Sequence, residues 1–153
     1  MNLGEALGLL KKEKSRLARL ISLRKDNVFV EEGKKTEFDP KKLSEEINNK
    51  IEDIRKLKIR IQKTNISSKL DKDNLTIAEA IIKIGDIRSK LSNLSTLFDR
   101  RRDRWLFDKD TKTYITQLNE SENEKEIERL EAEKTALDNK VQTANWNIEL
   151  VNY

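Results

Sequence analysis

One long amphipathic stretch, residues 127–151, limits most strongly what this chain can fold into. Its seam positions recur at alternating steps of three and four, the heptad pattern of a helix that packs along one narrow stripe. A helix of about 25 residues spans roughly 37 Å, and such a stripe needs a partner helix to cover it. The seam residues, with Lys134 as the one charged interruption, are Ile127, Leu130, Lys134, Leu137, Val141, Ala144, Ile148 and Val151.

An earlier stretch, residues 47–70, repeats this pattern when it is shifted by 80 positions. Ile47 then falls on Ile127, and Leu57 falls on Leu137. Both stretches close with an aliphatic residue, a glutamine, a variable residue, a small residue and an asparagine, as IQKTN and VQTAN. The shared ending is more specific than a heptad pattern alone, and it favours duplication.

A second echo precedes each of these helices at a shift of 74 positions. The segment Glu5-Ala6-Leu7 falls on Glu79-Ala80-Ile81, and Leu17 falls on Leu91. Together the two echoes predict a tandem repeat of a helix–loop–helix unit, residues 1–70 and 71–153, within a single domain of 153 residues.

The composition suits long, solvated helices. Charged residues make up 39% of the chain and hydrophobic residues 35%, and four Gly and one Pro leave few helix breakers. The sequence therefore predicts an all-α fold, an elongated antiparallel four-helix bundle made of two tandem helical hairpins. We also expect a minor β element in the connectors, because VFV at 28–30 and the run 113–118 are β-prone.

Local signals place the helix ends. We expect helices over residues 3–25, 40–65, 77–104 and 122–152, with connectors between the first two and between the last two. Asp39-Pro40 is a helix start, and Thr76 with Glu79 forms a capping box.

Several classes of function are excluded or disfavoured. The chain has no Cys and no His, which removes disulfides, zinc sites and Cys or His chemistry. It shows no secretion signal pattern and no apolar run of membrane-spanning length, so a cytoplasmic protein is expected. No phosphate loop, nucleophile elbow or catalytic triad is present, and we expect neither enzymatic activity nor a cofactor.

The repeat itself suggests one candidate site, a polar pole. In an antiparallel hairpin the start of the first helix lies beside the end of the second, which would gather carboxylate and amide groups. These oxygens suit a hard cation such as Mg²⁺ or Ca²⁺, or a small polar ligand. The plainer interpretation, which we favour, is a hydrogen-bonded network that fixes helix register, so no metal is predicted. The set comprises Glu5, Gln62, Asn65, Glu79, Gln142 and Asn145.

Two further groups are candidates for binding. Arginine beside aromatic rings can grip phosphates and stack on bases, although the acidic start of the last helix offers these arginines protein partners instead. The arginines are Arg100, Arg101, Arg102 and Arg104. Aromatic residues in the two connectors are hypothesised interface residues. They are Phe29, Trp105, Phe107 and Tyr114. Trp146, near the last helix end, could join an interface, but burial as a packing anchor is the better interpretation for it.

Short motifs along nearly the whole chain resemble a known family. LGEAL, VEEG, IQKTN, LTIAEAI and NWNIEL are similar to a family of small bacterial helical proteins known as septicolysin and otherwise treated as a domain of unknown function. The family name implies a pore-forming cytolysin. The chain departs from the family pattern at Ile84-Gly85-Asp86 and over residues 104–113.

The function expected first is a non-enzymatic, cytoplasmic assembly or protein-interaction module, a homo-oligomer that covers its leftover apolar seam. The protein partner and the biological process are left open. A membrane-acting cytolysin is the alternative, and weak nucleic-acid binding is the third candidate.

Overall fold

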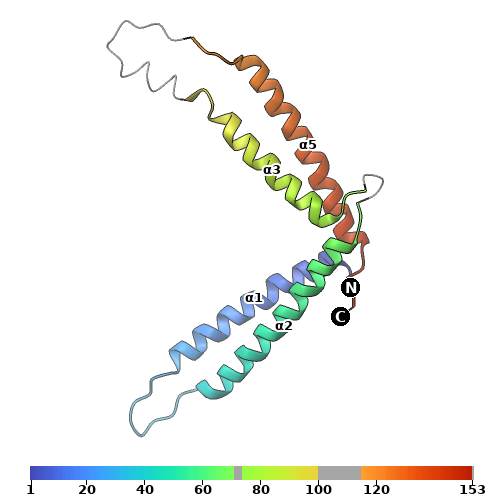
Figure 1. Cartoon of the computed structure of the whole chain (residues 1–153). Helices are drawn as coiled ribbons and strands as arrows, with labels where there is room; N and C mark the ends of the chain where they lie inside the picture. Colours follow the sequence, from blue (N-terminus) through green and yellow to red (C-terminus); the bar gives the residue numbers. More distant parts are fainter. Residues whose placement is uncertain (71–73, 100–114, 153) are drawn as a thin grey trace, which may run out of the picture. The chain divides into compact units, whose positions relative to one another are not determined.

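The computed structural model describes residues 1–70, 74–99 and 115–152, and these residues form four α-helices (Figure 1). Contacts divide the chain into two compact units. Met1–Lys69 and Thr143–Tyr153 make the first unit, and Leu70–Gln142 make the second.

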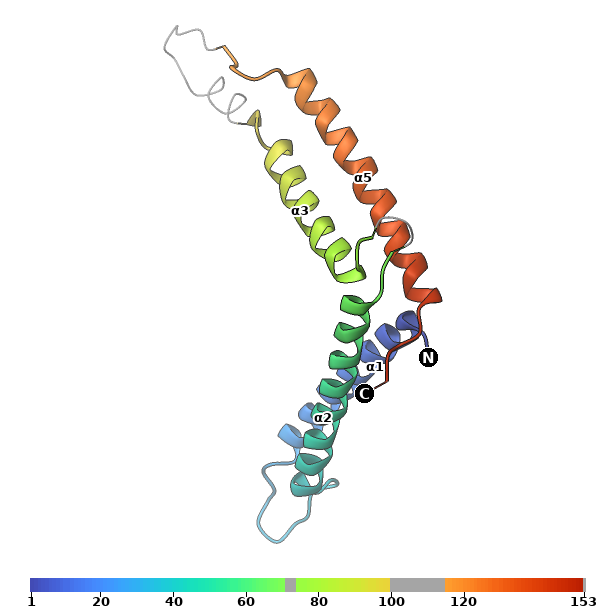
Figure 2. The same cartoon turned by 45° about the vertical axis from the view of Figure 1, so that its right-hand side comes forward.

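The first unit contains a hairpin of α1 (Leu3–Asp26) and α2 (Pro40–Ser67), which run side by side in Figures 1 and 2. The Asn2 side chain caps α1 by accepting from the Glu5 amide at 2.8 Å. The Glu5 carboxylate in turn accepts from the Asn2 amide. Asp39 caps α2 ahead of Pro40, the predicted helix start.

The second unit pairs α3 (Ile77–Ser95) with most of α5 (Glu120–Asn147). Lys83 Nζ meets Glu133 Oε1 at 2.8 Å, and Asn123 Nδ2 donates to the Leu94 carbonyl at 3.2 Å. The predicted all-α, four-helix architecture built from two antiparallel hairpins is therefore confirmed.

The core of each unit is a stripe with heptad spacing. In α2 the buried side chains step along Leu43, Ile47, Ile54, Leu57 and Ile61. Leu130, Leu137 and Val141 are the buried members of the predicted seam on α5, and its remaining members are half-buried. Lys134 stays in the seam by pairing with Asp138 at 2.7 Å, one turn further along the helix.

Two predicted helix ends were wrong. α3 stops at Ser95, where the hydroxyls of Ser95 and Thr96 donate to the Ser92 carbonyl at 3.0 and 3.2 Å. α5 stops at Asn147 instead of continuing to 152, because the chain that follows pairs with the N-terminus. The part of the predicted third helix from 100 to 104 lies outside the described residues.

The predicted β element in the connectors was wrong for every connector residue described. Residues 27–39 contain turns and no strand, with the turn closed by Lys34 N donating to the Glu31 carbonyl at 2.9 Å. Gly33 adopts φ 82° there, a conformation that glycine tolerates best. An antiparallel bridge forms elsewhere, between Asn2 and Glu149. Most of the second connector lies outside the described residues.

The two units carry the same contacts at the offsets that align their sequences. Capping boxes occur at Asn2 and at Thr76, which lie 74 positions apart. The Leu150 amide donates to the Met1 carbonyl at 3.0 Å, and the Leu70 amide donates to the Leu75 carbonyl at 2.7 Å. Donors and acceptors in these two bonds are related by the shifts of 80 and 74. These equivalences support the proposed tandem repeat.

Candidate functional site

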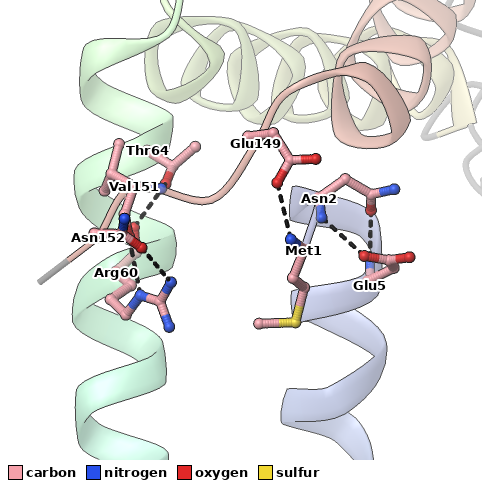
Figure 3. Close-up of polar contacts among 8 residues, drawn as sticks. All are labelled: Met1, Asn2, Glu5, Arg60, Thr64, Glu149, Val151 and Asn152. Atoms are coloured by element: carbon pink, nitrogen blue, oxygen red, sulfur yellow. Dashed lines mark hydrogen bonds and ion pairs between the residues drawn. The ribbon is translucent and has the colours of Figure 1, made fainter.

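The two ends of the chain meet in the first unit, at what we call the terminal junction: residues 1–6, 60–64 and 143–152 (Figure 3). The Leu3 amide donates to the Ile148 carbonyl at 2.9 Å, beside the bond from Leu150 to Met1. The terminal ammonium group meets the Glu149 carboxylate at 2.8 Å, and this ion pair raises the pKa of the ammonium group. The junction thus joins the N-terminal residues to the chain that follows α5.

Two side chains of α2 hold the C-terminal segment from the other side. Thr64, which is fully buried, accepts the Val151 amide at 3.1 Å and donates to the Arg60 carbonyl at 2.9 Å. Arg60 Nε donates to the Val151 carbonyl at 2.9 Å, and its guanidinium also reaches Asn152 (Figure 3). Residue 151 therefore has both its backbone groups paired to α2.

Gly4 lets α1 approach the end of α5 closely. A Cβ added at Gly4 would lie 3.1 Å from the Trp146 ring and 3.2 Å from the Asn145 carbonyl oxygen. Trp146 covers this glycine with one face and remains 62% exposed. The sequence predicted Trp146 as an anchor or interface residue, and its exposed face leaves the interface hypothesis open.

The predicted polar pole is divided between the two units. Glu5 and Glu79 both serve as capping-box carboxylates, each accepting the backbone amide of its own helix cap. Their helix-starting role accounts for the matching positions in the two repeats without a ligand.

The amide members of the polar pole differ in their exposure. In the first unit Asn65 is buried, Gln62 is exposed and Asn145 is half-buried, whereas Gln142 is exposed in the second unit. Within residues 1–70, 74–99 and 115–152 no group of three or more acidic side chains is placed to hold a metal ion. Ligand binding by this set stays an untested alternative to the favoured structural network.

A charged pair interrupts the seam between α1 and α2. Lys50 Nζ lies 2.7 Å from Glu13 Oε2, and Arg16 meets the other oxygen of Glu13 at 2.9 Å. The side chains of Glu13 and Lys50 are only 12% and 23% exposed. Close contact with the Lys50 ammonium group lowers the pKa of Glu13. The charges of Lys50 and Arg16 act in the same direction, and burial opposes them. The pair lines an open groove of about 380 Å³ with Leu9, Asp53 and other side chains.

An apolar patch lies on the loop between α1 and α2, at the end of this hairpin away from the chain termini (Figure 1). We call Val28, Phe29, Val30 and Phe38 the hairpin-tip patch. All four are exposed, and Phe29 is 89% exposed. The predicted interface residue Phe29 is therefore available for contact.

The other predicted binding residues cannot be placed. Three interface candidates, Trp105, Phe107 and Tyr114, lie outside the described residues. The same holds for the predicted phosphate-binding residues Arg100, Arg101, Arg102 and Arg104.

Sequence reasoning missed four residues that make contacts across the first unit. Glu13 and Lys50 fall on the seam spacing of their helices, so a search for charged seam positions of opposite sign would have found them. Thr64 carried a weaker signal, as the small residue of IQKTN. Arg60 carried none, because its partner is a backbone carbonyl distant in sequence.

Comparisons with known proteins give a family and a fold but no activity. No curated protein is significantly similar to this chain. A solved structure, described as a functionally unknown conserved protein from Corynebacterium diphtheriae, is 26% identical, with a TM-score of 0.80 over 99% of both chains. None of the described helices is both long enough and apolar enough to cross a membrane. A family profile matches residues 11–150, and the chain therefore belongs to the family of unknown function DUF6847.

Proposed function

We propose that the protein is a cytoplasmic, non-enzymatic assembly module that binds a second copy of itself through the hairpin-tip patch. The exposure of Phe29 carries this proposal, because a nearly fully exposed aromatic ring between two exposed valines is costly in water and favourable at an interface. Aromatic residues are enriched in protein interfaces.

The loop that bears the patch is held in a defined conformation, which supports recognition. Asn27 Nδ2 donates to the Leu23 carbonyl at 2.8 Å, and Asn27 Oδ1 accepts the Phe38 amide at 3.4 Å. Thr36 Oγ1 donates to the Phe38 carbonyl at 2.8 Å. These bonds tie both ends of the loop to the end of α1, so the patch is presented on an ordered support and less entropy is lost on binding.

A patch variant with a matched control tests the proposal. V28S/F29S/V30S removes most of the apolar surface without touching the loop's side-chain hydrogen bonds. I66S makes the same kind of change at an exposed apolar residue on α2. We expect light scattering after gel filtration to show an oligomer for the wild type and I66S, and a lower mass for the patch variant. An unchanged mass for the patch variant, with helix content retained by circular dichroism, would overturn the proposal.

The same exposed patch is compatible with the alternative, a membrane-acting protein like septicolysin. Dye release from liposomes distinguishes the two functions. An assembly module releases no dye at any concentration, whereas release that disappears in V28S/F29S/V30S and persists in I66S would favour the alternative. A gel-shift assay with labelled DNA and RNA at low salt tests the third candidate, for which we expect no shift.

A further inference from the structure

The two hairpins differ at one equivalent layer of their seams. Glu13 and Lys50 form an ion pair across α1 and α2. The shifts of 74 and 80 positions that align the two units carry these residues onto Ile87 and Leu130. Both of these residues are buried, at 3% and 2% exposure. The same layer is thus charged in the first unit and apolar in the second.

Similar hairpins in one chain create a pairing problem. Other layers of the two seams carry like residues, such as Ala6 and Ala80, or Ile61 and Val141, all of them buried. If these layers alone decided the pairing, α1 would pack against α5 as readily as against α2. In the same way, α3 would pack against α2 as readily as against α5. Such cross-pairing would occur within one chain or between copies, and helical repeats need a specific device against it.

We propose that Glu13 and Lys50 are the specificity-determining pair that keeps α1 with α2 and α3 with α5. Pairing α1 with α5 sets Glu13 against Leu130, and pairing α2 with α3 sets Lys50 against Ile87. Each mismatch leaves a mostly buried charge without its partner. In the native pairing Glu13 and Lys50 face each other, so each charge has its partner. Polar seam residues in coiled coils select the partner helix in this way.

The geometry of the pair suits this role. Glu13 Oε2 is inaccessible to solvent and lies 2.7 Å from Lys50 Nζ. Arg16, on the same helix as Glu13, would travel with Glu13 into a wrong pairing. It would reduce the cost at Glu13 only in part, and it would not help Lys50. We therefore expect the pair to favour the native arrangement at least about tenfold.

Cross-linking of cysteine pairs in the full chain measures the pairing directly, because the chain has no cysteine of its own. L9C/D53C reports native pairing, since Leu9 and Asp53 line one groove of the first unit. L9C/E133C reports cross-pairing, since Glu133 is the residue that the shift of 80 makes equivalent to Asp53. A short bismaleimide joins each cysteine pair in its own variant, and mass spectrometry of tryptic peptides gives the cross-linked fraction of each. The fraction for L9C/E133C divided by the fraction for L9C/D53C is the ratio of cross-paired to native product.

Three sets of substitutions separate a pairing role from a merely structural one. E13I/K50L makes both hairpins apolar, and I87E/L130K makes both charged. We expect either set to raise the ratio of cross-paired to native product at least about tenfold. In both sets the two hairpins carry the same kind of layer, so cross-pairing no longer leaves a charge without its partner. The four substitutions together move the charged layer into the second unit, and we expect the ratio to return to the wild-type value.

The same experiment can overturn the proposal. A ratio that stays at the wild-type value in both E13I/K50L and I87E/L130K would show that pairing is specified elsewhere. An equally raised ratio in the fourfold variant would show that any change in this layer disturbs pairing. If one double variant does not fold, the other double variant and the fourfold variant decide between the same outcomes.

Discussion

Thr64→Val is the substitution whose effect follows most directly from the terminal junction. The new side chain has nearly the shape of threonine, and it fills the same fully buried site. It removes the oxygen that accepts the Val151 amide at 3.1 Å. It also removes a donor to the Arg60 carbonyl, but that carbonyl belongs to the interior of α2 and keeps its place in the helix.

The expected cost comes mainly from the unpaired amide. A partly buried amide that loses its acceptor costs about 1 to 3 kcal/mol, and the added methyl group offsets less than about 1 kcal/mol. We therefore expect T64V to destabilise attachment of the C-terminal segment by about 1 to 2 kcal/mol. The Arg60 guanidinium still holds the Val151 carbonyl, so the segment should loosen and not detach fully.

Hydrogen exchange is the suitable assay because it resolves local opening. We expect faster exchange of the Leu150 and Val151 amides in T64V, by a factor of about 5 to 30, with unchanged exchange in the centre of α3. T64S keeps the acceptor and should protect Val151 better than T64V does. T96V removes an exposed hydroxyl in the second unit and serves as the distant control. Equal protection of Val151 in T64V and the wild type would refute the role assigned to this hydroxyl.

Two further predictions concern α1. Gly8 has open space around its Cβ position, so G8A should raise the melting temperature through helix propensity, worth about 1 kcal/mol. G4A should give a smaller gain or a loss of stability, because its Cβ would press against Trp146. Equal gains for both variants in a thermal melt would contradict the close approach of Gly4 to Trp146. Because the pKa of Glu13 is lowered, its contribution to stability is present above its ordinary value of 4.5 and is lost as the pH falls through the lowered value. We expect the melting temperature of the wild type to fall more steeply with acid than that of E13I/K50L, and parallel curves would count against the ion pair.

The fold was largely predictable because its signals are local. Helix starts at Leu3, Pro40 and Ile77 follow from cap residues beside them, and the seams follow from spacing. The end of α5 was not predictable, since residues after Asn147 leave the helix to pair with Met1 and Leu3 at the other end of the sequence. Local propensity carries no information about such a contact.

The candidate site was predicted less well, for a related reason. Glu5 and Glu79 stood out because they recur at equivalent positions, but capping explains that recurrence. Phe29 stood out because an aromatic residue in a connector has no helix seam to join. Its side chain is exposed, and its role at an interface stays a prediction. Glu13 and Lys50 were missed among many charged residues, although both fall on the seam spacing of their helices.

Sedimentation velocity of the unmodified chain over a wide range of concentrations tests the central claim, self-assembly through the hairpin-tip patch. The proposal predicts a species whose mass is a whole multiple of 17.9 kDa and whose population grows with concentration. A 17.9 kDa monomer at every concentration would contradict it.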